Sequence, residues 1–196
     1  MQAETGAPLT PDDAAGGPSA DSPRASARER RRNAALIVAI GAVWLLLDQA
    51  SKEWAEAELT GRPPVPVLGD LLQFRLLYNP GAAFSMGTGS TWIFTVLASV
   101  VVVVLVWQSR DVETPAWRWA FGLLLGGAGG NLTDRLLRDP GPGRGHVVDF
   151  IELPNFPVFN VADIGITSAA VLIALLALRG TPLAGAQATA QTEEAA

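Results

Sequence analysis

Two aspartates lie in unusually apolar surroundings. The stretch VVDFIELPNFPVFNVADIGI, residues 147–166, contains Asp149 and Asp163, and an uncharged tract begins at Ile164. An ionised carboxylate is costly near hydrocarbon, and such groups usually face a protein interior or a water-filled cavity. Two carboxyl groups that approach each other share one proton, so that one is a base that activates water and the other an acid. That is the chemistry of an aspartic protease. From the spacing alone, each could also be structural, with Asp163 as the N-cap of a helix.

Two further segments carry polar residues beside apolar ones. Asp48 and Lys52, in the sequence LDQASK, have the i,i+4 spacing at which side chains pair on a helix. The plainer interpretation of these two residues is an ion pair at the membrane interface, and the alternative is a direct catalytic role. In YNPGAAFSMG, Asn79 could orient a peptide substrate and Gly81 could make a tight turn, although Asn-Pro-Gly is also a common turn.

A third polar segment, GGAGGNLTDRLL, ends in Asn131, Asp134 and Arg135. Adjacent Asp and Arg residues at a membrane surface usually make structural ion pairs and hydrogen bonds. We therefore expect a structural role for these residues, and a role in the chemistry is the alternative.

The chain has few of the residues that other catalytic mechanisms require. A serine–lysine protease would have to use Lys52, whose neighbour Ser51 points to a different helix face, which leaves the distant Ser85. His146, the sole histidine, lies in the Gly/Pro-rich loop RDPGPGRGH, which is a poor place for the base of a Ser–His–Asp triad. One histidine also excludes a His-rich metal site, and the lack of cysteine excludes thiol catalysis and cysteine metal sites.

The elements that must position these residues are membrane helices. The chain is 49% hydrophobic, with a mean hydropathy of +0.27 and its apolar residues clustered. The apolar tracts cover residues 34–47, 91–107, 116–132 and 164–178. With a few interfacial residues added, each approaches the roughly 20 residues that span a bilayer. We therefore predict a membrane all-α fold of four transmembrane helices. The net charge of −5, without a basic patch, argues against nucleic-acid binding.

The ends of the chain differ from its middle. Residues 1–33 are rich in Ala, Pro, Gly, Ser and Asp, and residues 181–196 are similarly simple, so both are predicted to be disordered tails. Residues 34–180 are then the membrane domain. The first apolar tract continues into Asp48 without a small-residue cleavage site, which favours a retained helix over a cleaved signal peptide.

Basic residues set the predicted orientation. Five arginines precede the first tract, namely Arg24, Arg28, Arg30, Arg31 and Arg32. The positive-inside rule places this end in the cytoplasm, and four crossings return the C-terminus there. Loops 48–90 and 131–163 then face outward. The first of them contains VPVLGDLLQFRLLYN, whose β-branched and alternating residues predict short strands and a small extracytoplasmic sheet.

Glycines in the third tract predict close helix packing. Gly122, Gly126 and Gly130 recur every four residues and so share one helix face. Such a face lets a neighbouring helix approach closely, and we assign no chemistry to it.

Five motifs in a fixed order carry a family resemblance. They are DQASK at 48–52, NPGAAFS at 79–85, GNLTDR at 130–135, VVDF at 147–150 and FNVAD at 159–163. With four apolar spans, this series resembles the bacterial lipoprotein signal peptidase family, signal peptidase II. The match covers about residues 48 to 166.

The resemblance implies an intramembrane aspartic endopeptidase that removes signal peptides from diacylglyceryl-modified prolipoproteins, cutting before the lipidated cysteine. It implies Asp149 and Asp163 as the catalytic pair, with no metal and no organic cofactor. The supporting polar residues that it implies are Asp48, Lys52, Asn79, Gly81, Asn131, Asp134, Arg135 and Asn160.

The same resemblance implies where the protein acts and with what. It would be a multi-pass protein of the bacterial cell membrane, with a β-sheet cradle from the first outer loop and its active site at the extracytoplasmic face. Its partners would be lipid-modified prolipoproteins and membrane lipids, and it would act as a monomer.

Two departures from the family stand out. The DPGPGRG segment lengthens the path from Asp134 to Asp149, which affects loop conformation more than catalysis. Ile164 stands where the family often has serine, so a hydroxyl next to the pair is dispensable.

Two alternative functions belong to other classes of protein. One is a small transporter or channel, which would place acidic residues at mid-helix depth. The other is an assembly factor without enzymatic activity.

Overall fold

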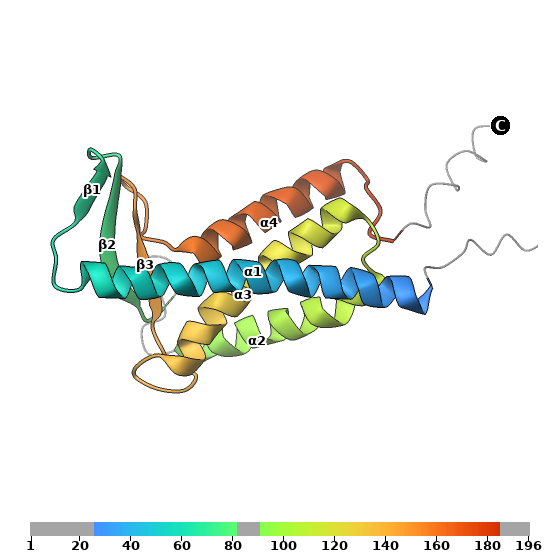
Figure 1. Ribbon diagram of the computed structural model, residues 1–196, viewed down its shortest axis with the longest axis horizontal. Helices are drawn as coiled ribbons and strands as arrows, with labels where there is room; N and C mark the ends of the chain where they lie inside the picture. Colours follow the sequence, from blue (N-terminus) through green and yellow to red (C-terminus); the bar gives the residue numbers. More distant parts are fainter. Residues whose placement is uncertain (1–25, 82–90, 185–196) are drawn as a thin grey trace, which may run out of the picture.

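The longest element is helix α1, Ala27–Leu59, in the computed structural model, which describes residues 26–81 and 91–184 (Figure 1). Ser26 caps its N-terminus in a reciprocal capping box with Glu29. The helix therefore begins inside the segment that the sequence predicts as a tail. The disorder predicted for residues 1–25 and 185–196 lies outside the described residues.

The remaining elements follow α1 in chain order. They are β1 (Val65–Leu68), β2 (Leu72–Asn79), α2 (Thr91–Gln108), the 3-10 turn η2 (Ser109–Asp111), α3 (Pro115–Leu137), β3 (Val147–Glu152) and α4 (Val161–Leu178). The sheet lies at one end of the helices, and α1 begins and α4 ends at the opposite end (Figure 1).

Three of the described helices are long and apolar enough to cross a membrane. They are α1, the segment Thr91–Asp111 that contains α2, and α4. The fold is thus a mostly helical membrane protein, as predicted. Helix α3 has 23 residues but is less apolar, since it carries glycines and the polar residues of its last turns.

Helix α3 packs against each of the other three helices. A methyl group at Gly126 would lie 2.6 Å from the carbonyl oxygen of Gly41, so the predicted glycine face does bring α3 close to α1. Gly127, which lies next to that face, performs the same role toward α4, where a methyl group would lie 2.8 Å from Ile166 Cγ1.

The sheet is antiparallel, in the order β1-β2-β3. The prediction that the first outer loop forms the sheet is therefore wrong in part, because β3 comes from the segment that contains Asp149. Aromatic rings attach the sheet to α1, with Trp54 edge-on to Phe74 at 5.3 Å and to Phe150 at 6.1 Å.

The chain turns back on β3 before α4 begins. Phe159 donates a backbone hydrogen bond of 3.0 Å to Ile151 and accepts one of 2.8 Å from it. This return places Asn160, the residue before α4, beside the strand that carries Asp149. The local backbone thus joins the two segments that hold the predicted catalytic residues.

Candidate active site

Asp149 is positioned by the pairing of β2 with β3. Asn79 pairs with Val147, so Asn79 and Asp149 are diagonal neighbours on one face of the sheet. The Asn79 side-chain amide donates a hydrogen bond of 2.9 Å to Asp149 Oδ2. Its carbonyl oxygen accepts a hydrogen bond of 3.0 Å from the backbone N–H of Gly81, which fixes the amide in this orientation. Asp149 itself is buried, with 2% of its surface exposed.

Asp163 lies in the first turn of α4. It is the third residue of the helix rather than the N-cap, and the cap is Asn160, so the capping interpretation shifts by three residues. Asn160 Oδ1 accepts a hydrogen bond of 3.0 Å from the backbone N–H of Asp163, and Asp163 Oδ2 accepts one of 3.3 Å from the backbone N–H of Asn160. This reciprocal capping uses only Oδ2 of the Asp163 carboxylate. The other oxygen, Oδ1, accepts a hydrogen bond of 2.9 Å from Asn131 Nδ2 of α3.

Asn160 links the two aspartates. Its Nδ2 donates to Asp149 Oδ1 at 2.6 Å and to Asn131 Oδ1 at 3.2 Å. Both oxygens of Asp149 therefore accept a side-chain N–H, one from Asn79 and one from Asn160. The structure thus brings together Asp149, Asp163 and the three asparagines named from the sequence.

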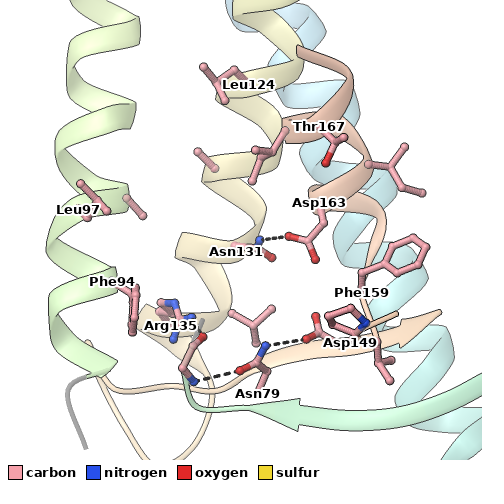
Figure 2. A pocket seen from close by; sticks show the side chains of 18 of the residues that line it. Asn79, Phe94, Leu97, Leu124, Asn131, Arg135, Asp149, Phe159, Asp163 and Thr167 are labelled. Carbon is pink, nitrogen blue, oxygen red and sulfur yellow. Dashed lines mark hydrogen bonds between the residues drawn. The ribbon is translucent and has the colours of Figure 1, made fainter. Parts of the chain in front are cut away.

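Both aspartates line one cavity of about 810 Å³ (Figure 2). Its polar wall consists of Asn79, Asn131, Arg135, Asp149 and Asp163. Its apolar wall includes Phe94, Leu97 and Val101 of α2, Leu124 and Ala128 of α3, Phe156 and Val158 of the loop before α4, and Ile164 and Ile166 of α4. A cavity with this lining suits a substrate that is peptide at one end and hydrocarbon at the other.

Burial raises the pKa of Asp149 to about 7, and the nearby charge of Asp163 acts in the same direction. The hydrogen bonds from Asn79 and Asn160 act in the opposite direction, since they favour the ionised form, but the cost of burial outweighs them. A carboxyl group in this state can hold a proton near neutral pH and release it in a reaction.

Lys52 is buried between two carboxylates. Its ammonium lies 2.8 Å from Asp48 Oδ2 and 2.7 Å from Asp134 Oδ2, and all three side chains are 0% exposed. The predicted i,i+4 pair is therefore present, but inside the protein rather than at a wet interface. Each carboxylate also accepts a backbone N–H, Asp48 from Ala162 at 2.8 Å and Asp134 from Val148 at 3.2 Å. The group thus holds the backbone next to both candidate catalytic residues.

Asp134 and Arg135, although adjacent in the sequence, have different partners in the structure. Asp134 pairs with Lys52 and Arg138, whereas the Arg135 guanidinium donates to the Gly81 carbonyl at 2.7 Å. It also lies 5.4 Å from the centre of the Phe94 ring. Arg135 is only 7% exposed, and its Nη1 has no hydrogen-bond partner among the described residues. Arg135 is also one of the residues that line the cavity (Figure 2).

The sequence interpretation missed two contributors to the site. Gln49 donates hydrogen bonds to Asp48 at 3.1 Å, to the Gly130 carbonyl at 3.2 Å and to Asp134 at 3.1 Å. Trp44 donates from Nε1 to the Val161 carbonyl at 3.1 Å, which ties the start of α4 to α1. The only signal for Gln49 was its place inside the DQASK motif, and none pointed to Trp44.

The alternative catalytic residues are not part of this cavity. Ser51 donates its hydroxyl to the Asp48 carbonyl at 2.7 Å, and His146 is not among the residues that line the cavity. Ser85 lies outside the described residues. Within the described parts of the chain, no three His, Cys, Asp or Glu side chains form a group able to hold a metal ion.

Comparisons with known proteins identify the family. The family profile described as "Signal peptidase (SPase) II" matches residues 40–179. A lipoprotein signal peptidase of Mycolicibacterium smegmatis is 44% identical over 180 residues, which cover 92% of this chain and 74% of that protein. One of Mycobacterium tuberculosis is 46% identical over 173 residues, which cover 88% of this chain and 84% of that protein.

Solved structures agree with this result. Two structures described as bacterial membrane enzymes, obtained by the in meso method at 2.3 and 1.9 Å resolution, have TM-scores of 0.65 and 0.64 to this chain. They are 28% and 27% identical to this chain, respectively. Each match covers 74% of this chain, and it covers 88% of the first solved chain and 94% of the second. The chain therefore belongs to the family of lipoprotein signal peptidases, signal peptidase II.

Proposed function

We propose that Asp149 and Asp163 are the catalytic pair with which this enzyme removes signal peptides from diacylglyceryl-modified prolipoproteins, cutting before the lipidated cysteine. The observation that carries this proposal is that both carboxyl groups line one cavity whose remaining wall is largely apolar. Amide N–H groups of Asn79, Asn131 and Asn160 hold the two carboxyl groups in place.

The burial of the two groups divides their roles. Asp149, with its raised pKa, holds the shared proton, and Asp163, which is less buried, acts as the base. Asp163 takes a proton from a water molecule, whose oxygen attacks the scissile carbonyl carbon. Asp149 donates its proton to the carbonyl oxygen, and the collapse of the tetrahedral intermediate releases the amine with a proton returned from the pair. Arg135 Nη1, which has no hydrogen-bond partner in the part of the chain that the structure describes, would hold a substrate carbonyl.

The apolar wall supports a lipid-bearing substrate. It includes residues of α2, α3 and α4 and of the loop before α4. Acyl chains on the substrate cysteine can lie against Leu97, Val101 and Ile164, while the peptide reaches the aspartates. This arrangement avoids transferring the acyl chains into water, which costs about 0.8 kcal/mol per CH₂ group.

The predicted topology belongs to the same proposal. With 23 residues, α3 is about 34 Å long, which is sufficient for a fourth crossing. Its polar last turn is covered by α1 and the sheet, so those side chains need not face lipid. Arginines in the first turns of α1 favour a cytoplasmic N-terminus and C-terminus, with the sheet and the cavity at the extracytoplasmic face. One chain supplies every group of the site, which supports a monomer.

The test uses the full-length enzyme in lipid vesicles with a diacylglyceryl-modified prolipoprotein. Asp149→Asn and Asp163→Asn keep the size of each side chain but remove its proton chemistry. We expect each to lower cleavage at least about a thousandfold, in keeping with the loss of a general acid or base. Asp70→Asn, at an exposed turn between β1 and β2, is the matched control and should cleave normally. Retained cleavage by either active-site variant would refute the proposal.

A further inference from the structure

Asn131 stands between Lys52 and Asp163. Its Oδ1 accepts a hydrogen bond of 3.0 Å from the Lys52 ammonium, and its Nδ2 donates one of 2.9 Å to Asp163 Oδ1. One planar amide thus connects a buried charge on α1 with a predicted catalytic carboxylate on α4.

The neighbours of Asn131 allow only one orientation of its amide. Reversing it would place the NH₂ group against the Lys52 ammonium and against the NH₂ group of Asn160, both of which can only donate. The carbonyl oxygen would then face the carboxylate of Asp163, which leaves two acceptors in contact. An ammonium is the stronger of the two donors that prevent this reversal, because the hydrogen bond is charge-assisted.

The other two asparagines of the site are oriented in a different way. The side-chain oxygen of Asn79 accepts from the backbone N–H of Gly81, and that of Asn160 from the backbone N–H of Asp163. Asn131 lies inside α3, where backbone N–H groups donate to carbonyl groups of the same helix. Its orienting donors must therefore come from side chains, and of the two, Lys52 and Asn160, Lys52 makes the shorter and charge-assisted hydrogen bond.

All three N–H groups of the Lys52 ammonium are used. They face Asp48 Oδ2, Asp134 Oδ2 and Asn131 Oδ1 at 2.8, 2.7 and 3.0 Å. The two carboxylates hold the ammonium in place, and the third N–H points at the amide. If Lys52 served only as a counterion for Asp48 and Asp134, its hydrogen bond to Asn131 would not be required.

We propose that Lys52 is a positioning residue that acts through Asn131, whose amide it orients so that an N–H is always directed at Asp163. The proposal rests on the proposed function, because it assigns Lys52 a part in keeping Asp163 ready as the base. Lys52 does not line the cavity, so it is not a substrate-binding residue.

Other charges surround Asp163 and must be separated from this effect. They are Asp149 on β3, Arg135 and Asp134 on α3, and Asp48 and Lys52 on α1. Lys52 could in principle act on the aspartates by its charge at a distance. A double-mutant cycle separates that action from an action through Asn131.

The cycle consists of Lys52→Met, Asn131→Ala and the double variant, each assayed in vesicles for kcat, KM, the pH–rate profile and the melting temperature. A carboxylate that loses an N–H donor is a stronger base, so we expect the acid limb of the profile, where activity falls as the pH is lowered, to move to higher pH in each single variant. KM should stay unchanged in Lys52→Met, because Lys52 does not line the cavity. In the Asn131→Ala background, Lys52→Met should cause no further displacement of the acid limb.

Two results would overturn the inference. A lower melting temperature with an unmoved acid limb in Lys52→Met would reduce Lys52 to a structural counterion. An equal displacement by Lys52→Met with and without Asn131 would mean that its charge acts directly. If Lys52→Met fails to fold because it leaves two buried carboxylates unpaired, the same comparison is made within Asp48→Asn/Asp134→Asn, with and without Lys52→Met. There again, a displacement by Lys52→Met that disappears in the Asn131→Ala background supports the inference, and an unmoved acid limb or an equal displacement in both backgrounds overturns it.

The outcome is separate from that of the proposed function. If Asp163→Asn cleaves normally, the catalytic pair is wrong whatever Lys52 does. If Asp163→Asn is inactive and the cycle shows no displacement through Asn131, only the role of Lys52 is wrong.

Discussion

The Asn160 amide lies 2.6 Å from the carboxyl group of Asp149 and at the same time caps the helix that carries Asp163. One side chain thus sets where α4 begins and how the strand carboxyl group is held. Helix capping and catalytic geometry are therefore coupled, and a change at Asn160 should affect both the stability and the activity of the enzyme.

Asn160→Ala should destabilise the protein by roughly 0.5–2 kcal/mol, as expected for the loss of an N-cap. Cleavage should fall further than this loss of stability explains, because Asp149 also loses a hydrogen bond. Thermal unfolding and cleavage of a lipidated prolipoprotein measure the two effects. Ser26→Ala is the control, since it removes a capping box of the same kind at the far end of α1. Equal losses of activity in both variants would contradict the coupling.

The pH dependence of cleavage should have a basic limb near pH 7. Burial raises the pKa of Asp149 to about 7, so the proton is present below that pH and is lost above it. Cleavage by the wild-type enzyme should therefore decline as the pH rises through 7. The measured values belong to the pair of carboxyl groups.

Asn79→Ala should move this basic limb to higher pH. The Asn79 amide favours the ionised form of Asp149, so its loss raises the pKa further and the proton persists to higher pH. A pH–rate profile of kcat/KM compares the variant with the wild type. A shift toward lower pH would show that Asn79 does not act on Asp149 as its hydrogen bond indicates.

Arg135→Lys should raise KM at least about tenfold, since hydrogen bonds to charged groups contribute roughly 1.5–3 kcal/mol. Lysine keeps the charge but loses the planar group that reaches Gly81 with one N–H and the cavity with another. Steady-state kinetics with a lipidated substrate provide the test. Arg62→Lys, at an exposed ion pair, is the control. An unchanged KM in Arg135→Lys would mean that Arg135 Nη1 does not contact the substrate.

Two i,i+4 ion pairs near the C-terminal half of α1 should differ sharply in their effect on stability. Asp48→Asn breaks a pair that is 0% exposed and should cost about 3–5 kcal/mol, because Lys52 then lacks one of its buried partners. Glu58→Gln breaks a pair in which both side chains are more than half exposed, and should cost about 0–1 kcal/mol. Melting temperatures of the two variants give the comparison. Similar values for both would mean that Asp134 alone compensates Lys52.

The sequence predicted what depends on local spacing. Apolar tracts identify the lipid-facing parts of the helices, and the separation of Asp48 from Lys52 places them on one face of a helix. It did not predict how far α1 extends beyond its apolar tract, because many residues on either side of that tract are charged. A hydropathy pattern shows which part of a helix contacts lipid, but it does not show where the helix begins and ends.

Contacts between distant segments could not be predicted in this way. Lys52 and Asn131 are 79 positions apart, and only the packing of α1 on α3 makes them neighbours. Strand β3 was missed because its first four residues are buried, so that no alternation of polar and apolar residues marks it. The sequence could not show the partners of Asp134 and Arg135 either, because the turn of the helix directs these adjacent side chains to different segments.

The two aspartates belong to elements that a bilayer holds in different ways. Asp163 lies in the first turn of α4, whose tilt follows the thickness of the hydrocarbon layer, whereas Asp149 lies on a strand that packs on the end of α1. A bilayer that is too thin or too thick would change the tilt of α4 relative to the strand and so separate the pair. Lipid acyl length would then tune the enzyme without any regulatory ligand, and cleavage would peak in membranes whose thickness matches the helices.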